Sequence, residues 1–216
     1  TQLKPFFKLS ENFVTQDTQS YCGVASGTIV LNSMDDKVKI PTDPIYSPYK
    51  YFTQKMFLKN ECVTNVMQLH EFFIFRGMTL GQLGNSLKCF NVEVDEVYYN
   101  DKHLSEMESQ MIAAIDDGKF VVANVDRPQL EEIGGGHFSP IGSYTTVEDV
   151  HGRHTWFLFM GVARYKYKPM WIRSEELFNS MAKIDSSSKK PRGFLIVSPP
   201  SEDIRTQDSF PKIIIN

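Results

Sequence analysis

The chain has 216 residues, of which 41% are hydrophobic and 23% charged, so it is long enough to form one well-buried domain over residues 1–216. Its 23 basic and 26 acidic residues give a formal net charge of −3, without the basic excess expected of a nucleic-acid-binding protein. It contains no run of about 18 apolar residues, so no membrane-spanning helix is expected.

The first half of the chain is predicted to be mainly helical. The segment YCGVASGTIVLN is small and apolar, with its polar residues spaced as on one side of a helix, which indicates a buried helix beginning near Cys22. Prolines 41, 44 and 48 then indicate an irregular connection. Further helices are expected over Thr64–Phe75, from the N-cap Thr79 to about Phe90, and over Ser105–Asp117.

The last third is predicted to be rich in strands. Short apolar or alternating runs bounded by turn residues indicate strands, and Ser-Glu-Glu opens one more helix. Helices followed by strands predict an α+β fold with a mostly antiparallel sheet and a functional cleft between the two halves. The expected strands are Asn91–Tyr99, Phe120–Val125, His137–Val147, Thr155–Val162 and Gly193–Val197, and the helix is Ser174–Met181.

The three cysteines are too few and too widely spaced to indicate a disulfide framework, and none has the spacing of a zinc site. Cys62 and Cys89 are interpreted as small buried hydrophobic residues. Cys22 lies where a helix begins, and the unpaired N–H groups and partial positive charge there favour the reactive thiolate. Its position alone leaves an inert buried cysteine equally open.

Two further residues complete a pattern typical of thiol enzymes. Gln16 precedes Cys22 by six residues, so its amide can donate to an oxyanion together with the Cys22 backbone N–H. His137 follows three glycines and can accept a thiol proton, then protonate a leaving amine. The residues alone therefore indicate a Cys/His enzyme. The remaining histidines lack such surroundings and are interpreted as surface or helix-face residues: His70, His103, His151 and His154.

Six segments, in order, resemble the phytochelatin synthase family, especially its short prokaryotic-type forms without the Cys-rich C-terminal region. They are FVTQDTQSYCGVASGTIVLNSM, YSPYKYFTQ, RGMTLGQL, GGGHFSPIGSY, VARYKYKPMW and DSSSKKPRGFLIVS. The resemblance implies a papain-like cysteine protease fold and an enzyme that cleaves the Cys–Gly bond of glutathione. Glycine would leave, and the γ-Glu-Cys acyl group would pass from the enzyme to water or to a second glutathione.

The resemblance also implies roles for individual residues. Cys22 would be the nucleophile, His137 the base and Gln16 the oxyanion donor. An arginine suits the α-carboxylate of the γ-glutamyl group and an aspartate suits its ammonium, although ordinary surface charges are the alternative reading. The positions that match the substrate cleft of the family are Asn124, Arg127, Gly136, Asp185 and Arg192.

The sequence departs from the family pattern at Gly161, which stands where the family has the Asp of its catalytic triad. That carboxylate fixes the histidine tautomer and stabilises the imidazolium, so its loss is expected to impair activity. Three explanations stay open: an engineered change, another acceptor for His137 such as Asp149 or a water, or a pseudoenzyme that only binds glutathione-like thiols. A papain-like peptidase for other peptides fits Cys22 and His137 equally well but leaves the VARYKY and PRGF segments unexplained.

The resemblance implies glutathione as the substrate and no cofactor. No dedicated metal site is expected, and heavy-metal thiolates such as cadmium–glutathione would serve as co-substrates or activators. A homodimer is common in the family, but no residue pattern here indicates one, and neither nucleic acid nor membrane is expected as a partner. Thiol chemistry on glutathione favours a reducing cytoplasm, while a start at Thr1 without Met leaves export open.

Overall fold

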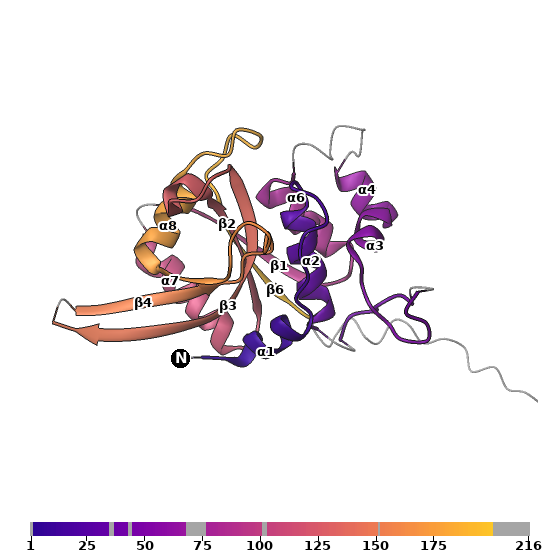
Figure 1. Cartoon of the computed structure of the whole chain (residues 1–216), viewed down its shortest axis with the longest axis horizontal. Coiled ribbons are helices and arrows are strands. Elements are labelled where there is room, and N and C mark those ends of the chain that lie inside the picture. Colours follow the sequence, from indigo (N-terminus) through magenta and orange to yellow (C-terminus); the bar gives the residue numbers. More distant parts are fainter. Residues whose placement is uncertain are drawn as a thin grey trace, which may run out of the picture.

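The computed structural model describes residues 2–34, 37–42, 45–67, 77–100, 103–150 and 152–200. Figure 1 shows one sheet with helices on both of its faces. The helices are α1 (Lys4–Glu11), α2 (Cys22–Asn32), α3 (Gln54–Lys59), α4 (Glu61–Met67), α6 (Leu80–Lys88), α7 (Leu104–Asp116) and α8 (Ser174–Ala182). The strands are β1 (Glu93–Tyr98), β2 (Phe120–Asp126), β3 (Gly136–Asp149), β4 (Gly152–Phe159), β5 (Met170–Arg173) and β6 (Gly193–Ser198), and a short 3-10 turn, η3, covers Arg127–Leu130.

The six strands form one sheet in the order β1-β6-β2-β3-β4-β5, and each neighbouring pair is antiparallel. Side chains alternate between the two faces of a strand, and β2 shows this clearly because both of its faces are buried. Phe120 and Val122 pack into a core with α2 and α6, whereas Val121, Ala123 and Val125 pack into a second core with α7 and α8. The fold is therefore α+β and antiparallel, as predicted, with a helical layer on each face of the sheet.

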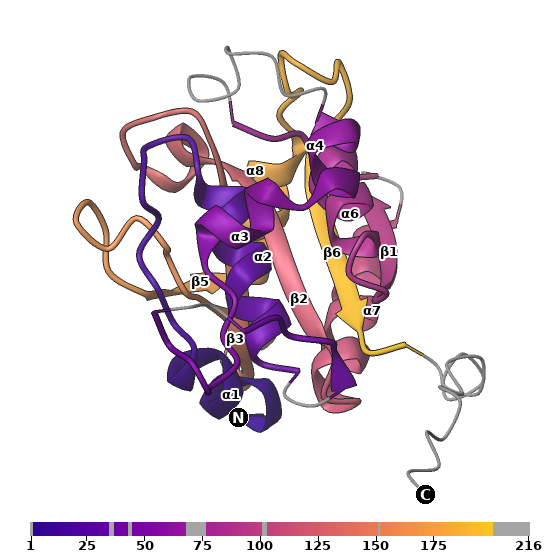
Figure 2. The same ribbon diagram turned by 90° about the vertical axis from the view of Figure 1, so that its right-hand side faces the viewer.

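Helix α2 lies in the centre of the first core, and every one of its residues is buried. Small residues allow its close contacts: a methyl group added at Gly27 would lie 2.9 Å from a ring carbon of Phe57. In Figure 2, α2 lies alongside β2 and β3, and both strands contact it. The first residue of α2, Cys22, is thereby placed at the end of a rigid element beside the sheet.

Several predicted elements agree with the structure, and a few do not. Thr79 caps α6 through a capping box in which its hydroxyl accepts from the Gln82 backbone N–H. The strand expected over Thr155–Val162 instead begins at Gly152 and ends at Phe159. Of the helix expected over Thr64–Phe75, residues 68–75 lie outside the described part of the chain. Helices α1 and α3 and strand β5 were not predicted from the sequence.

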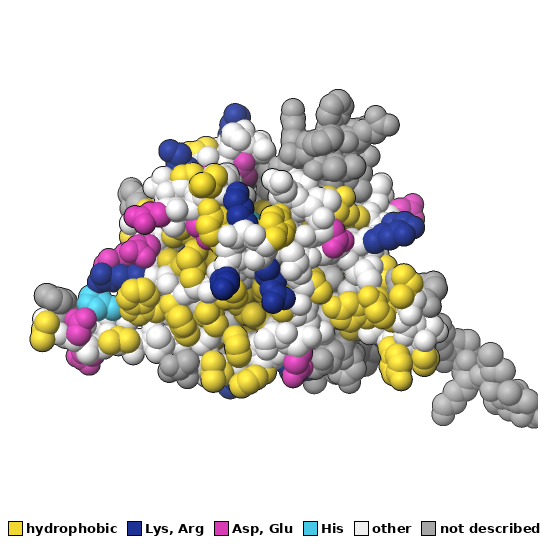
Figure 3. Space-filling view, viewed as in Figure 1, with side chains coloured by type: hydrophobic (Ala, Val, Ile, Leu, Met, Phe, Trp, Pro, Cys, Tyr) yellow, Lys and Arg dark blue, Asp and Glu magenta, His cyan; other side chains and the backbone are white. Residues whose placement is uncertain are grey.

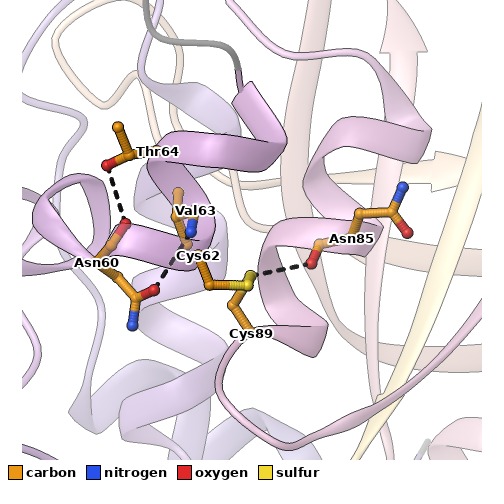
Figure 4. Close-up of a disulfide and its surroundings, with 6 residues drawn as sticks. All are labelled: Asn60, Cys62, Val63, Thr64, Asn85 and Cys89. Atoms are coloured by element: carbon orange, nitrogen blue, oxygen red, sulfur yellow. Dashed lines mark hydrogen bonds between the residues drawn. A yellow bond between two sulfur atoms is a disulfide. The ribbon is translucent and has the colours of Figure 1, made fainter.

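The interpretation of Cys62 and Cys89 as separate buried thiols is wrong, because the two residues form a disulfide (Figure 4). Cys62 lies in the first turn of α4 and Cys89 is the C-cap of α6, with 5.7 Å between their Cα atoms. Helices α4 and α6 pack together, which brings cysteines separated by 27 positions into bonding distance. Such a crosslink is typical of proteins that fold in an oxidising compartment. Cys22 is the free cysteine of the chain.

We expect the Cys62→Ser, Cys89→Ser double variant to have a lower free energy of unfolding than the oxidised wild-type chain. The crosslink closes a loop of 27 residues, and the chain-entropy relation gives about 3 to 4 kcal/mol for a loop of that length. Urea unfolding with and without a reductant measures the difference. Equal midpoints for the oxidised wild-type chain and the double variant would contradict the assignment of the disulfide.

In the described part of the chain, no helix combines the length and apolar character needed to cross a bilayer. Acidic and basic side chains are both spread over the face shown in Figure 3, without a broad area of one sign. Within the same described ranges, no group of three or more His, Cys, Asp or Glu side chains is arranged to hold a metal ion.

Candidate functional site

A polar cavity of about 660 Å³ opens at the N-terminal end of α2, and Cys22 is part of its wall. The wall comes from four parts of the fold that are far apart in the sequence: the segment that leads into α2, the residues just before α6, strands β2 and β3 with the glycine before β3, and the loop that precedes β6. Its lining residues include Thr18, Gln19, Ser20, Cys22, Met78, Asn124, Gly135, Gly136, Phe138, Asp185, Ser186, Ser187 and Arg192. The cleft between the helical layer and the sheet was predicted from the sequence.

The thiol of Cys22 is mostly buried, with 6% of the residue exposed. Burial raises the pKa of Cys22, and hydrogen bonding to the backbone of Phe138 and Gly23 and the charge of Arg127 oppose this rise. The raised pKa means that the resting thiol is protonated at neutral pH, so it needs a base before it can act as a nucleophile.

His137 lies on β3 opposite Val125 of β2, and 2% of the residue is exposed. Burial lowers its pKa well below the usual value, and the positive charges of Arg127 and Lys166 lower it further. The imidazole is therefore neutral at pH 7. The next residue, Phe138, is the one whose backbone reaches the Cys22 thiol. The structure thus places a neutral histidine next in the chain to Phe138, whose backbone reaches the Cys22 thiol, while His137 itself is not one of the residues that line the cavity.

We expect His137→Gln to reduce the loss of stability that the wild-type chain suffers in mild acid. The unfolded chain protonates His137 near its ordinary pKa of about 6.5, whereas the folded chain protonates it only at lower pH. Between those two values the unfolded state binds more protons, so the free energy of unfolding falls as the pH falls, by up to about 1.4 kcal/mol per pH unit.

Urea unfolding from pH 7.5 to 5.0 measures this difference between His137→Gln and the wild-type chain. His103→Gln is the matched control, since the His103 side chain is 48% exposed beside Glu106 at the start of α7. If the His137→Gln and wild-type stability curves ran parallel over this range, the assignment of a neutral, buried His137 would be wrong.

Gln16 is 4% exposed and is not one of the residues that line the cavity, although Thr18, two positions later, is. Its Nε2 donates to the carbonyl of Thr18 at 2.7 Å and to the hydroxyl of Tyr165 at 3.1 Å, and its backbone N–H donates to the carbonyl of Val162. Both amide donors are thus engaged within the protein. Release of the exposed Tyr165 side chain would free one of them for a ligand.

Arg192 is a buried cation at the other end of the cavity. Its Nη1 donates to Oδ1 of Asn124 at 3.1 Å, and Asp126 and Asp185 lie 3.6 Å and 4.0 Å from the guanidinium nitrogens. Nδ2 of Asn124 and Nε of Arg192 are buried without a hydrogen-bond partner.

Gly136 leaves room for the guanidinium, because an added Cβ would lie 2.8 Å from Cζ of Arg192. Four of the positions predicted for the cleft therefore meet here: Asn124, Gly136, Asp185 and Arg192.

Asp126 was not identified from the sequence. It follows Asn124 by two positions on β2, so both side chains point to the same face of the sheet and reach the same arginine. Side chains alternate along a strand with a period of two residues, and this alternation is the sequence signal that could have identified Asp126.

Arg127 does not line the cavity, although the family pattern placed it in the cleft. Its Nε lies 3.1 Å from a carboxylate oxygen of Glu132, and its guanidinium lies over the ring of Tyr167 at 5.6 Å. Burial raises the pKa of Glu132, and the neighbouring Arg127 and Lys166 charges oppose the rise. The pair holds the loop that leads into β3, so Arg127 supports the glycine segment before His137.

Gly161 is buried in the loop after β4, next to Val162. Val162 donates its N–H to Oγ of Ser139 at 3.1 Å, and Oγ of Ser139 lies 3.2 Å from Nε2 of His137. A Cβ at Gly161 would meet only the carbonyl oxygens of residues 167 and 168, at 3.6 and 3.9 Å. The position expected to carry a carboxylate is therefore next in the chain to the residue that holds Ser139 against Nε2 of His137, and it has room for a side chain.

The suggestion that Asp149 serves His137 as an alternative acceptor is wrong. Both residues belong to β3, but they are separated by twelve positions, roughly 40 Å along an extended strand. Asp149 instead lies 3.3 Å from His154 near the far end of the β3–β4 hairpin. His70 and His151 lie outside the described residues.

Comparisons with known proteins relate the chain to one family. The sequence profile described as phytochelatin synthase matches residues 1–194. Glutathione gamma-glutamylcysteinyltransferase 3 of Lotus japonicus is 28% identical over 91% of this chain and 38% of that protein, and glutathione gamma-glutamylcysteinyltransferase 1 of Arabidopsis thaliana is 27% identical over 93% and 38%. The Schizosaccharomyces pombe glutathione gamma-glutamylcysteinyltransferase is 24% identical over 92% of this chain and 44% of that protein.

The chain thus spans about two fifths of the length of the curated relatives that it matches. Among solved structures, SERA5E from Plasmodium falciparum aligns over 89% of this chain and 92% of that chain, with 8% identity and a TM-score of 0.42. The fold of this chain is α+β, with Cys22 at the N-terminus of α2 and His137 on β3. Because the family profile covers most of its length, the chain belongs to the phytochelatin synthase family.

Proposed function

We propose that this chain is a catalytic domain, residues 1–216, that cleaves the bond between cysteine and glycine in glutathione. The observation that carries the proposal is the cavity itself. A free thiol at a helix N-terminus forms one part of its wall, close to the backbone of Phe138 that follows His137, and a buried arginine flanked by carboxylates forms another. Membership of the phytochelatin synthase family supplies the substrate class.

In the first half of the proposed reaction, Sγ of Cys22 attacks the carbonyl carbon of the Cys–Gly bond while its proton passes to His137. A C–S bond forms and the carbonyl electron pair moves onto oxygen. The backbone N–H of Cys22, and Gln16 once Tyr165 has released its amide, would stabilise this oxyanion. The C–N bond then breaks, and the imidazolium returns its proton to the amine of the departing glycine.

The second half removes the γ-Glu-Cys group from the enzyme. Water, or the amino group of a second glutathione, loses a proton to His137 as it attacks the thioester. The C–S bond breaks, and the Cys22 thiolate recovers its proton from the imidazolium. The product is γ-Glu-Cys in the first case and a phytochelatin in the second.

The charges around Arg192 suit the head group of a γ-linked glutamate. That group carries both a carboxylate and an ammonium, because its α-carbon lies outside the peptide bond. Arg192 can pair with the carboxylate, while Asp185 and Asp126 offer acceptors to the ammonium. The buried Nδ2 of Asn124 has a free donor for a substrate oxygen. Because Asp126 and Asp185 already balance the charge of Arg192, this site favours a zwitterionic substrate group over a simple anion.

A panel of three peptides tests the proposed function: glutathione, the α-linked Glu-Cys-Gly isomer and Cys-Gly. We expect glycine release from glutathione and at least about tenfold less from the others, since neither presents the γ-glutamyl head group to Arg192. Equal release from the two tripeptides would favour a general papain-like peptidase. Release from none of them by a folded chain would contradict the proposal.

Gly161 favours a second candidate, a domain that binds glutathione-like thiols without turnover. Burial and the charges of Arg127 and Lys166 lower the pKa of His137, and no carboxylate is among the groups that shift it. Calorimetric titration with glutathione, together with an absence of glycine release, would support this alternative over the enzyme.

A further inference from the structure

On the basis of the proposed function, we propose that Ser139 is a positioning residue that holds Nε2 of His137 and so turns Nδ1 toward Cys22. It would do part of the work that the family assigns to the aspartate at the position of Gly161. Nothing in the family resemblance assigned a role to this serine.

The geometry of Ser139 carries the proposal. Ser139 and His137 are two positions apart on β3, so their side chains point to the same face of the strand. Ser139 is completely buried, and its Oγ lies 3.2 Å from Nε2 of His137. The backbone N–H of Val162 donates to the same Oγ at 3.1 Å, which fixes the hydroxyl from the opposite side. Because Ser139 occupies Nε2, Nδ1 is the ring nitrogen left for the thiol.

Among the described residues, no acidic group competes for this place. Gly161 has no side chain, and Asp149 is at the other end of β3. The charged groups that act on His137 are Arg127 and Lys166, and both are cations. Within the described ranges, Ser139 is thus the one side chain that forms a hydrogen bond with the imidazole.

A serine and a carboxylate differ in how they fix the imidazole proton. A carboxylate only accepts, so it holds the proton on Nε2 and leaves the lone pair of Nδ1 for the Cys22 proton. The Ser139 hydroxyl already accepts from Val162, and it can then either accept from Nε2–H or donate to a bare Nε2. Only the first state is productive. Ser139 would therefore fix the orientation of the ring while leaving two tautomers in equilibrium.

Ser139→Ala tests the proposal, with Ser143→Ala as the matched control. Both serines are fully buried on β3, but the hydroxyl of Ser143 donates to the backbone carbonyl of Gln2, away from the site. We expect Ser139→Ala to lower kcat for glycine release by about tenfold with KM changed by less than about twofold, and Ser143→Ala to leave both near wild type. In a Gly161→Asp background the cost of Ser139→Ala should shrink to less than about threefold, because the new carboxylate holds Nε2 instead.

A second readout keeps this test separate from the proposed function. The ¹⁵N chemical shifts of the His137 ring report which nitrogen carries the proton, whether or not the chain turns glutathione over. We expect Ser139→Ala to shift the Nε2 resonance and Ser143→Ala to leave it unchanged. If the wild-type chain released no glycine, the proposed function would fail and the ring shifts would decide the role of Ser139. Unchanged shifts in Ser139→Ala, or a kcat equal to that of Ser143→Ala, would overturn the inference.

Discussion

Gly161→Asp is expected to raise the rate of glycine release from glutathione by about 10- to 100-fold. The position is beside Val162, whose N–H reaches Ser139 on the Nε2 side of His137. An added Cβ would make ordinary contacts, at 3.6 Å and 3.9 Å from two carbonyl oxygens. A carboxylate there would hold the proton on Nε2 and stabilise the imidazolium that forms when Cys22 attacks. It would also oppose the effect of burial, Arg127 and Lys166, and so raise the pKa of His137.

Gly161→Asn is the control for the added volume, because it introduces a side chain of the same shape without the charge. We expect it to give much less of the gain, since an amide does not lock the tautomer. The acidic limb of the pH–rate profile should also move to higher pH in Gly161→Asp, following the raised pKa of His137. An aspartate variant that folds normally yet is no faster than the asparagine variant would contradict this account of Gly161.

Gly136→Ala is expected to lower kcat/KM for glutathione by about 10- to 100-fold, mainly through KM. A methyl group at this position would overlap Nη1 of Arg192 and lie 2.8 Å from both Cζ and Nη2. The guanidinium would have to move away from Asn124, and the pairing proposed for the substrate carboxylate would be lost. The guanidinium is the far end of a flexible side chain and can shift, so the effect should fall mainly on binding.

Gly135→Ala is the matched control for this prediction. It adds the same methyl group one residue earlier in the glycine segment, where no atom lies within 4 Å of the new Cβ. Steady-state kinetics and thermal unfolding of both variants separate a local effect on Arg192 from a general effect on the loop. Similar KM values for the two variants would argue against a role for Arg192 in holding the substrate.

Sequence patterns predicted the central elements of the fold because their signals are local. Helix α2 and strand β2 are continuous apolar segments, and α6 begins with a capping box within four residues. The missed elements depend on tertiary contacts. Helix α3 has six residues and packs Phe57 against Phe90, and β5 has four residues that pair only with β4. The disulfide was missed because its cysteines meet only when α4 packs on α6.

The same distinction applies to the site. Cys22 and His137 were predicted because sequence signals place Cys22 at the start of a helix and His137 at the start of a strand that follows three glycines. Ser139 was within the quoted motif, but its role depends on a hydrogen bond from Val162, which is distant in sequence. Asp126 could be identified only by extending the side-chain alternation of β2 two positions beyond Asn124. Arg127 was placed in the cleft by its family position, whereas its pairing with Glu132 directs it into the supporting loop.

The central claim is that Cys22 carries the γ-Glu-Cys group, and intact-mass spectrometry of the chain after incubation with glutathione tests it most directly. Glycine released into solution is measured in the same samples, with Cys22→Ala as the control. We predict a γ-Glu-Cys adduct on Cys22 in the wild-type chain, accompanied by glycine release, and neither in Cys22→Ala. A folded wild-type chain that forms no adduct and releases no more glycine than Cys22→Ala would contradict the account.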